Sequence, residues 1–67
     1  MKEQKIGTFI QQLRKENNLT QKELGEQLNI TDKAISKWER GLSCPDISLI
    51  IPLARILGVS ASELLNG

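Results

Sequence analysis

The fold is decided by LTQKELGEQLNITDKAISKWERG, residues 19–41, because this segment holds two short helical patterns separated by a turn. The first pattern begins at Thr20, whose hydroxyl can accept a hydrogen bond from the backbone N–H of Glu23. The Glu23 carboxylate can in turn accept from the Thr20 N–H, which completes a capping box. Leu24 and Leu28 then recur at helical spacing and mark the buried side of this helix.

A turn and a second helix follow within the same segment. Asn29 stands where a tight turn requires a positive φ, and Ile30 is expected to fill the corner between the helices. Thr31 is suited to cap the second helix, which Gly41 closes. Gly25 faces that second helix, at a place where a side chain larger than methyl is expected to force the helices apart. Two short helices joined by such a turn form a helix-turn-helix.

The helix that begins at Thr31 has two different faces. Ala34, Ile35 and Trp38 fall on one side, which argues for a core role of Trp38 rather than stacking on a base. The opposite side is polar and carries Asp32, Lys33, Ser36, Lys37 and Arg40. Taken alone, a polar helix face with two lysines is usually only solvated, so any function for it depends on the surrounding motif.

Helical spacing also recurs on the N-terminal side of this segment. Ile6, Ile10 and Leu13 repeat at intervals of four and three, which predicts a first helix over about residues 3–16. Asn17-Asn18 follow it, and asparagine tolerates the left-handed conformation that closes helices. No stretch of four residues alternates as a strand would, so we predict an all-α domain.

The C-terminal third predicts two further helices. Residues 42–47 have the composition of a loop, and Ser48 is expected to cap a fourth helix that ends at Leu57. Pro52 would fall in the first turn of that helix or just after it, where few intrahelical bonds are lost. Ser60 is expected to cap a last short helix. The chain therefore predicts five short helices joined by tight turns.

Length and composition exclude several classes of protein. A chain of 67 residues forms one small domain with a thin core, and no apolar run approaches the ~20 residues of a membrane span. A single cysteine and no histidine allow no internal disulfide and no zinc site, which indicates a reducing, cytoplasmic setting. Without histidine, metal-ligand clusters or a glycine loop for phosphate, an enzyme is poorly supported. Cys44 has no basic partner nearby in sequence and is interpreted as a bystander.

The sequence resembles the Cro/C1-type (XRE family) helix-turn-helix domain of phage and bacterial repressors. The resemblance rests on the segment of residues 19–41 followed by ILGVSASELL at residues 56–65, and it runs from about Ile6 to Leu65. It implies a single compact five-helix domain over residues 1–67 with the lambda-repressor-like fold. Gly25 replaces the usual alanine, which weakens its helix by up to ~1 kcal/mol, and Asn29 replaces the usual glycine.

The resemblance implies that the helix Thr31–Arg40 enters the DNA major groove with its N-terminal end first. Base edges or nearby phosphates would then be faced by Thr31, Asp32, Lys33, Ser36 and Lys37. Gln21 resembles the glutamine that clamps a phosphate, and Lys22 lies nearer the DNA backbone. A helix start also attracts anions through its free N–H groups, which suits the place of Gln21.

Asp32 and Arg40 each have alternative roles, and Arg14 and Glu39 are expected to pair. Asp32 either accepts from cytosine N4 or, as we favour, complements the positive end of its helix. Arg40 either touches phosphate or stabilises the helix C-terminus, and the sequence does not separate these roles. The resemblance implies an ion pair between Arg14 and Glu39, which would fix the reading helix to the rest of the domain.

We therefore expect a sequence-specific transcription regulator, acting as a repressor on double-stranded DNA without a cofactor or metal. The net charge of +1 offers few cations for phosphate, so we expect two copies to bind a two-fold site, with contact through residues 60–65. The alternative is a protein-interaction module, an antitoxin or regulatory subunit, in which DNA binding is secondary. Whether a C-terminal effector or membrane part follows residue 67 is left open by the sequence.

Overall fold

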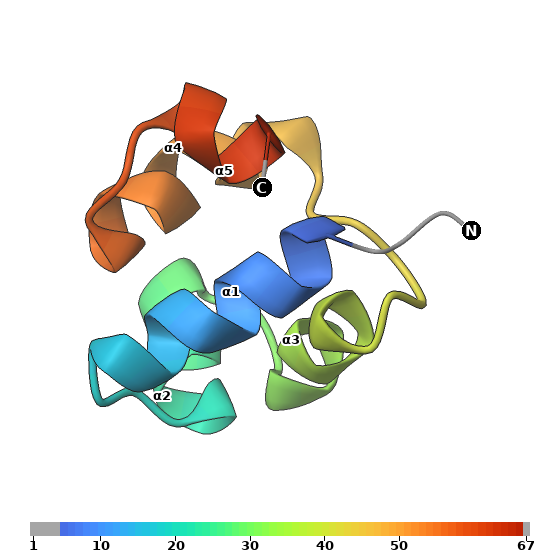
Figure 1. Ribbon diagram of the computed structural model, residues 1–67. Helices are drawn as coiled ribbons and strands as arrows, with labels where there is room; N and C mark the ends of the chain where they lie inside the picture. The colour runs from blue at the N-terminus through green and yellow to red at the C-terminus, as the bar shows by residue number, and fades with distance from the viewer. Residues whose placement is uncertain (1–4, 67) are drawn as a thin grey trace.

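The computed structural model describes residues 5–66, which form five helices and no strand (Figure 1). In chain order the helices are α1 (Lys5–Glu16), α2 (Gln21–Leu28), α3 (Asp32–Glu39), α4 (Ile47–Leu57) and α5 (Ala61–Asn66). The predicted start of the first helix, at residue 3, lies outside the described residues. Within residues 5–66, no helix has the length and apolar character needed to span a membrane.

The core is built where α1 crosses the middle of the molecule, between the pair α2–α3 and the pair α4–α5 (Figure 1). Every helix contributes one large side chain that is fully buried: Ile10, Leu24, Ile35, Leu53 and Leu64. Full burial of such a side chain stabilises a fold by about 1.5–3 kcal/mol. The predicted all-α architecture of five short helices is confirmed.

The first four helices end in left-handed residues, as the sequence predicts. The residues with positive φ that follow them are Asn18, Asn29, Gly41 and Gly58. After α3, for example, the N–H of Leu42 donates to the Lys37 carbonyl at 2.8 Å and that of Gly41 to Trp38 at 3.1 Å. These two bonds form a Schellman motif and satisfy carbonyls that would otherwise lack partners.

The predicted caps of the shorter helices are present. Thr20 Oγ1 accepts from the N–H of Glu23 at 3.0 Å, and Glu23 Oε1 accepts from the Thr20 N–H at 2.9 Å. Thr31 Oγ1 accepts from the Ala34 N–H at 3.2 Å. At the start of α5, Ser60 pairs with Glu63 in the same reciprocal manner, so this helix also begins with a capping box.

The predicted start of α4 is wrong by two residues. Asp46 rather than Ser48 caps the helix, because the Asp46 carboxylate accepts from both the backbone N–H of Ser48 at 3.0 Å and its hydroxyl at 2.6 Å. These hydrogen bonds hold the pKa of Asp46 below its ordinary value. Ile47 therefore belongs to the helix, and Pro52 lies in its second turn, from which α4 continues to Leu57.

Two glycines mark places where backbones touch. A Cβ at Gly25 would lie 2.8 Å from the Ile30 carbonyl oxygen, so even a methyl group is crowded there, and by the turn rather than by a helix face. The sequence analysis did not identify Gly7, where a Cβ would lie only 2.1 Å from the Trp38 carbonyl oxygen. That close approach brings α1 against the C-terminal end of α3.

Candidate nucleic-acid interface

The polar face of α3 is directed away from the core. Ile35 and Trp38 are buried, as predicted, and Thr31 at the cap is exposed. The exposed or half-buried residues on the other side are Asp32, Lys33, Ser36, Lys37 and Arg40. Lys33, Ser36, Lys37 and Arg40 follow one another at intervals of three, one and three, and therefore form a single strip along the helix. The structure thus brings together the predicted reading residues.

The N-terminal end of α3 carries two side chains with a role in the helix itself. Thr31 caps the helix, so its hydroxyl oxygen is already accepting a backbone hydrogen bond. Asp32 lies in the first turn and is exposed, where a negative charge complements the positive end of the helix. This position fits the role favoured from the sequence, and it leaves Lys33 and Lys37 as the exposed cations of the first two turns.

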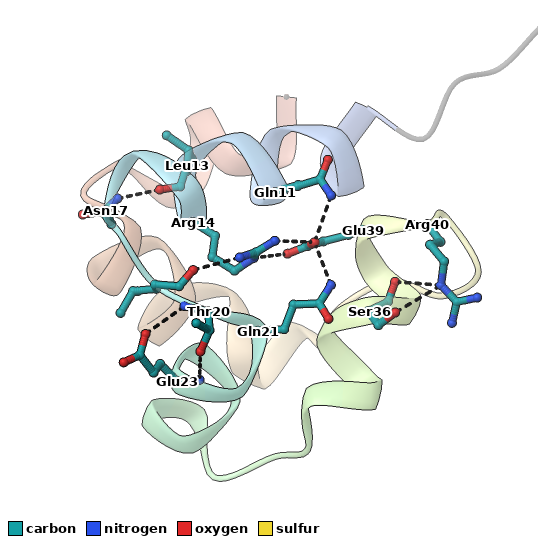
Figure 2. Close-up of polar contacts among 11 residues, drawn as sticks. Gln11, Leu13, Arg14, Asn17, Thr20, Gln21, Glu23, Ser36, Glu39 and Arg40 are labelled. Atoms are coloured by element: carbon teal, nitrogen blue, oxygen red, sulfur yellow. Dashed lines mark hydrogen bonds and ion pairs between the residues drawn. The ribbon is translucent and has the colours of Figure 1, made fainter.

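Arg40 folds back along α3 by one turn. Its Nε donates to Ser36 Oγ at 3.1 Å and to the Ser36 carbonyl oxygen at 3.3 Å (Figure 2). The sequence analysis named both residues but did not pair them, although a spacing of four on a helix makes two side chains neighbours.

Glu39 lies at the centre of a polar network that joins α1, α2 and α3 (Figure 2). Arg14 donates to it twice, from Nε to Oε2 at 2.6 Å and from Nη2 to Oε1 at 3.1 Å. The remaining Arg14 donor, Nη1, reaches the Leu19 carbonyl at 2.8 Å. Only 1% of the Glu39 side chain and 10% of the Arg14 side chain are exposed to solvent. The pair implied by the resemblance is therefore present, and it is buried.

Two glutamines complete this network. Gln21 Nε2 donates to Glu39 Oε1 at 3.0 Å, and Gln11 Nε2 donates to the same oxygen at 3.3 Å. A phosphate contact is predicted for Gln21 from the sequence, whereas Gln11 and both contacts with Glu39 are not. One hydrogen of the Gln21 amide is engaged by the carboxylate, so the second hydrogen is the one left for an anion. Lys22 beside it is exposed.

Glu39 is negatively charged at neutral pH. Burial alone would raise the pKa of its carboxyl, but hydrogen bonds from Arg14, Gln21 and Gln11, together with the charge of Arg14, lower it below the ordinary value of 4.5. Because the Arg14 guanidinium balances this charge inside the domain, Glu39 exerts little repulsion on an anion bound at the surface.

A separate apolar surface lies on α4 and α5. Ile47 and Ile51 are one turn apart on α4 and are 79% and 56% exposed, and Leu65 on α5 is 55% exposed. A shallow groove between the two helices is lined by Ile51, Ala54, Arg55, Val59 and Ala61. Leu65 follows Ala61 by one turn, so it continues the α5 side of this groove. Leu65 belongs to the segment 60–65 through which contact was expected, whereas the exposure of Ile47 and Ile51 was not predicted.

Comparison with known proteins is consistent with this geometry. A family model described as helix-turn-helix matches residues 10–64. The HTH-type transcriptional activator BcrR of Enterococcus faecalis is 43% identical over 58 residues, which cover 87% of this chain but only 28% of that protein. The uncharacterized HTH-type transcriptional regulator y4dJ of Sinorhizobium fredii is 35% identical over 61 residues, which cover 91% of this chain and 79% of that protein.

Among solved structures, the P22 c2 repressor in complex with a synthetic operator has the same fold. Its TM-score to this chain is 0.83 at 30% sequence identity, over 88% of this chain and 89% of that chain. The helices of the two proteins are therefore arranged alike over nearly the whole domain.

Proposed function

Because this chain belongs to the Cro/C1-type helix-turn-helix family, we propose that it is a sequence-specific DNA-binding transcription regulator that reads the major groove with α3. The observation that carries the proposal is the strip of polar side chains on α3, on a fold like that of an operator-bound repressor. Its relatives BcrR and y4dJ are named as HTH-type transcription regulators, and we propose no catalytic activity for the domain. We propose that it represses transcription, by similarity to the P22 c2 repressor. The relative BcrR, in contrast, is named as an activator.

In this proposal the two ends of the motif have different tasks. The B-DNA major groove is about 12 Å wide and admits one helix, and a lysine pairs best with guanine O6 and N7. Lys33, near the N-terminus of α3, enters the groove deepest. Lys37, one turn further along α3, is the second side chain expected to contact a base edge. Gln21 and Lys22 at the start of α2 contact the phosphate backbone, which positions the domain without reading sequence.

Replacing the two lysines separately tests this division. Lys33→Ala is expected to weaken binding to the specific site by about 1–3 kcal/mol and to relax preference at one or two base pairs. Lys22→Ala is expected to weaken specific and random DNA alike and to lower the salt slope of log affinity by about 1. Sites selected from random DNA at one salt concentration, for the parent and both variants, give the comparison.

Two outcomes would count against the proposal. If Lys33→Ala leaves the base profile unchanged while Lys22→Ala alters it, the reading face is misplaced. If the parent binds random DNA with no dependence on salt, the domain is better described as a protein-interaction module.

We further propose that two copies act together on a two-fold site whose half-site centres lie about one helical turn, ~10 bp, apart. The low net charge of +1 leaves one domain with few phosphate contacts. The groove between α4 and α5 offers a self-complementary contact, since Ile51 and Leu65 project beside it. A two-fold interface uses the same surface on both subunits, as this arrangement requires.

Placing a charge in that surface tests the dimer. Ile51→Asp and Leu65→Asp should each weaken association and specific DNA binding about tenfold or more, because a carboxylate would be buried without a partner. Gln27→Asp adds the same charge at an exposed polar position of α2, outside the expected contact, and serves as the control. Sedimentation equilibrium and titration of the selected site measure both effects. A stoichiometry of one chain per specific site would contradict the proposal.

A further inference from the structure

The contact between Ser36 and Arg40 bears on how α3 reads a base. Arg40 Nε lies 3.1 Å from Ser36 Oγ, and the two side chains lie on the same strip as Lys33 and Lys37. Arg40 is exposed and Ser36 is half-buried, so the pair forms at the surface that faces away from the core (Figure 2). The two lysines of the strip make no such contact with Ser36 in the described residues.

The chemistry of this contact gives the Ser36 hydroxyl a direction. A serine hydroxyl has one proton to donate and two lone pairs to accept with, whereas a guanidinium only donates. Ser36 Oγ must therefore accept from Arg40, and its own proton points elsewhere. Among residues 5–66, the Ser36 hydroxyl proton has no acceptor in a hydrogen bond.

We propose that Arg40 is a positioning residue, which makes Ser36 a hydrogen-bond donor to an acceptor on a base edge. In the major groove such acceptors are guanine N7 and O6, adenine N7 and thymine O4, whereas cytosine presents the N4 amino group, a donor. Donation from the cationic Arg40 occupies one lone pair of Ser36 Oγ and strengthens its O–H as a donor, so the pair favours one of these acceptors over the cytosine amino group at the position under Ser36. This inference rests on the proposed function, since it needs α3 in the groove.

Arg40 could instead bind a phosphate with its Nη groups, and the two roles predict different data. A phosphate contact lowers affinity for all sequences and reduces the salt slope by about 1 when it is removed. A positioning role changes the preference at one base pair, the same pair that Ser36 reads.

The experiment compares Ser36→Ala, Arg40→Met and the double variant by selection from random DNA and by salt titration. Lys15→Met is the matched control, because it removes a positive charge and a similar stem from an exposed position on α1, away from both α3 and the groove between α4 and α5. Ser36→Ala should reduce the preference for an acceptor at one base pair about fivefold. Arg40→Met should reduce the preference at that same pair, and the double variant should match Ser36→Ala. Lys15→Met should leave the base profile unchanged.

Thermal unfolding of each variant establishes that the fold is intact, and a loss of stability alone does not change the preference at one base pair. If Arg40→Met leaves the profile unchanged and lowers only the salt slope, Arg40 is a phosphate contact and the inference is wrong. A change at a different base pair from that of Ser36→Ala overturns it as well. A parent that selects no sequence at all overturns the proposed function itself, whereas a selective parent insensitive to Ser36→Ala overturns this inference alone.

Discussion

Glu39→Ala is expected to lower the free energy of unfolding by about 3–5 kcal/mol, because it leaves the Arg14 guanidinium buried without its carboxylate. Gln11 and Gln21 lose the same acceptor. Small domains have a total stability of about 5–15 kcal/mol, and one of 67 residues belongs near the lower end. The variant is therefore expected to be largely unfolded at 37 °C, and urea titration followed by circular dichroism measures the loss at 10 °C.

Glu16→Ala is the matched control for this substitution. Glu16 is exposed at the end of α1, where it accepts only from the amide of Gln12 at 3.2 Å. Its removal should change stability by less than about 0.5 kcal/mol. Equal urea midpoints for Glu39→Ala and the parent would show that the network contributes nothing to the fold.

The pH dependence of stability gives a second readout of Glu39. Its folded-state pKa lies below the ordinary value of 4.5, so the folded protein binds fewer protons there than the unfolded chain. The stability from this carboxylate is thus fully present above pH 4.5 and is lost as the pH falls below 4.5 through the folded-state pKa. The exposed Asp46 carboxyl adds a dependence of the same sign, which a Glu39→Gln variant retains. Subtracting the stability curve of Glu39→Gln against pH from that of the parent gives the contribution of the Glu39 carboxylate.

Gly7→Ala is expected to destabilise the domain by about 3 kcal/mol, the upper end of overpacking effects. The new Cβ would lie 2.1 Å from the Trp38 carbonyl oxygen and 3.3 Å from that of Glu39, and neither backbone atom can turn away. Relief requires α1 and α3 to separate, which also lengthens the contacts between Arg14 and Glu39. The gain in helix propensity of about 1 kcal/mol offsets only part of the loss.

Gly25→Ala is the comparison for that result. Its Cβ would lie 2.8 Å from the Ile30 carbonyl oxygen, so a smaller shift suffices, and the same propensity gain applies. Its net effect on the urea midpoint is expected to be small. If Gly7→Ala is as stable as Gly25→Ala, the close approach of α1 and α3 is not what fixes their spacing.

The features that the sequence predicts well depend on a few neighbouring residues. The capping box at Thr20, the cap at Thr31 and the left-handed residue Asn29 each follow from side-chain chemistry within four positions. The cap of α4 was misplaced because Asp46 and Ser48 are both good N-cap residues and lie two positions apart. Side-chain chemistry alone does not show which of the two caps the helix. In the folded chain Asp46 caps it and accepts hydrogen bonds from Ser48.

Features that depend on how helices cross were not accessible from sequence patterns. Nothing near Gly7 indicates that the carbonyl of Trp38 will approach it, since the two residues are far apart in the chain. Gln11 and Gln21 meet at one oxygen of Glu39 only after three helices have packed. The pairing of Arg14 with Glu39 was expected through family resemblance alone. The strip on α3 was predictable because helical periodicity defines it, but the direction of the Ser36 hydroxyl was not.

The left-handed closures after the first four helices also have a consequence for the rate of folding. Each closure is completed by hydrogen bonds between residues at most five positions apart, as in Leu42 to Lys37 and Val59 to Ala54. Chain reversals between residues close in sequence lose little entropy when the loop closes. Helical domains dominated by such local contacts fold in microseconds to milliseconds. The domain is therefore expected to acquire its structure within that time, so that little unfolded chain is exposed to aggregation after synthesis.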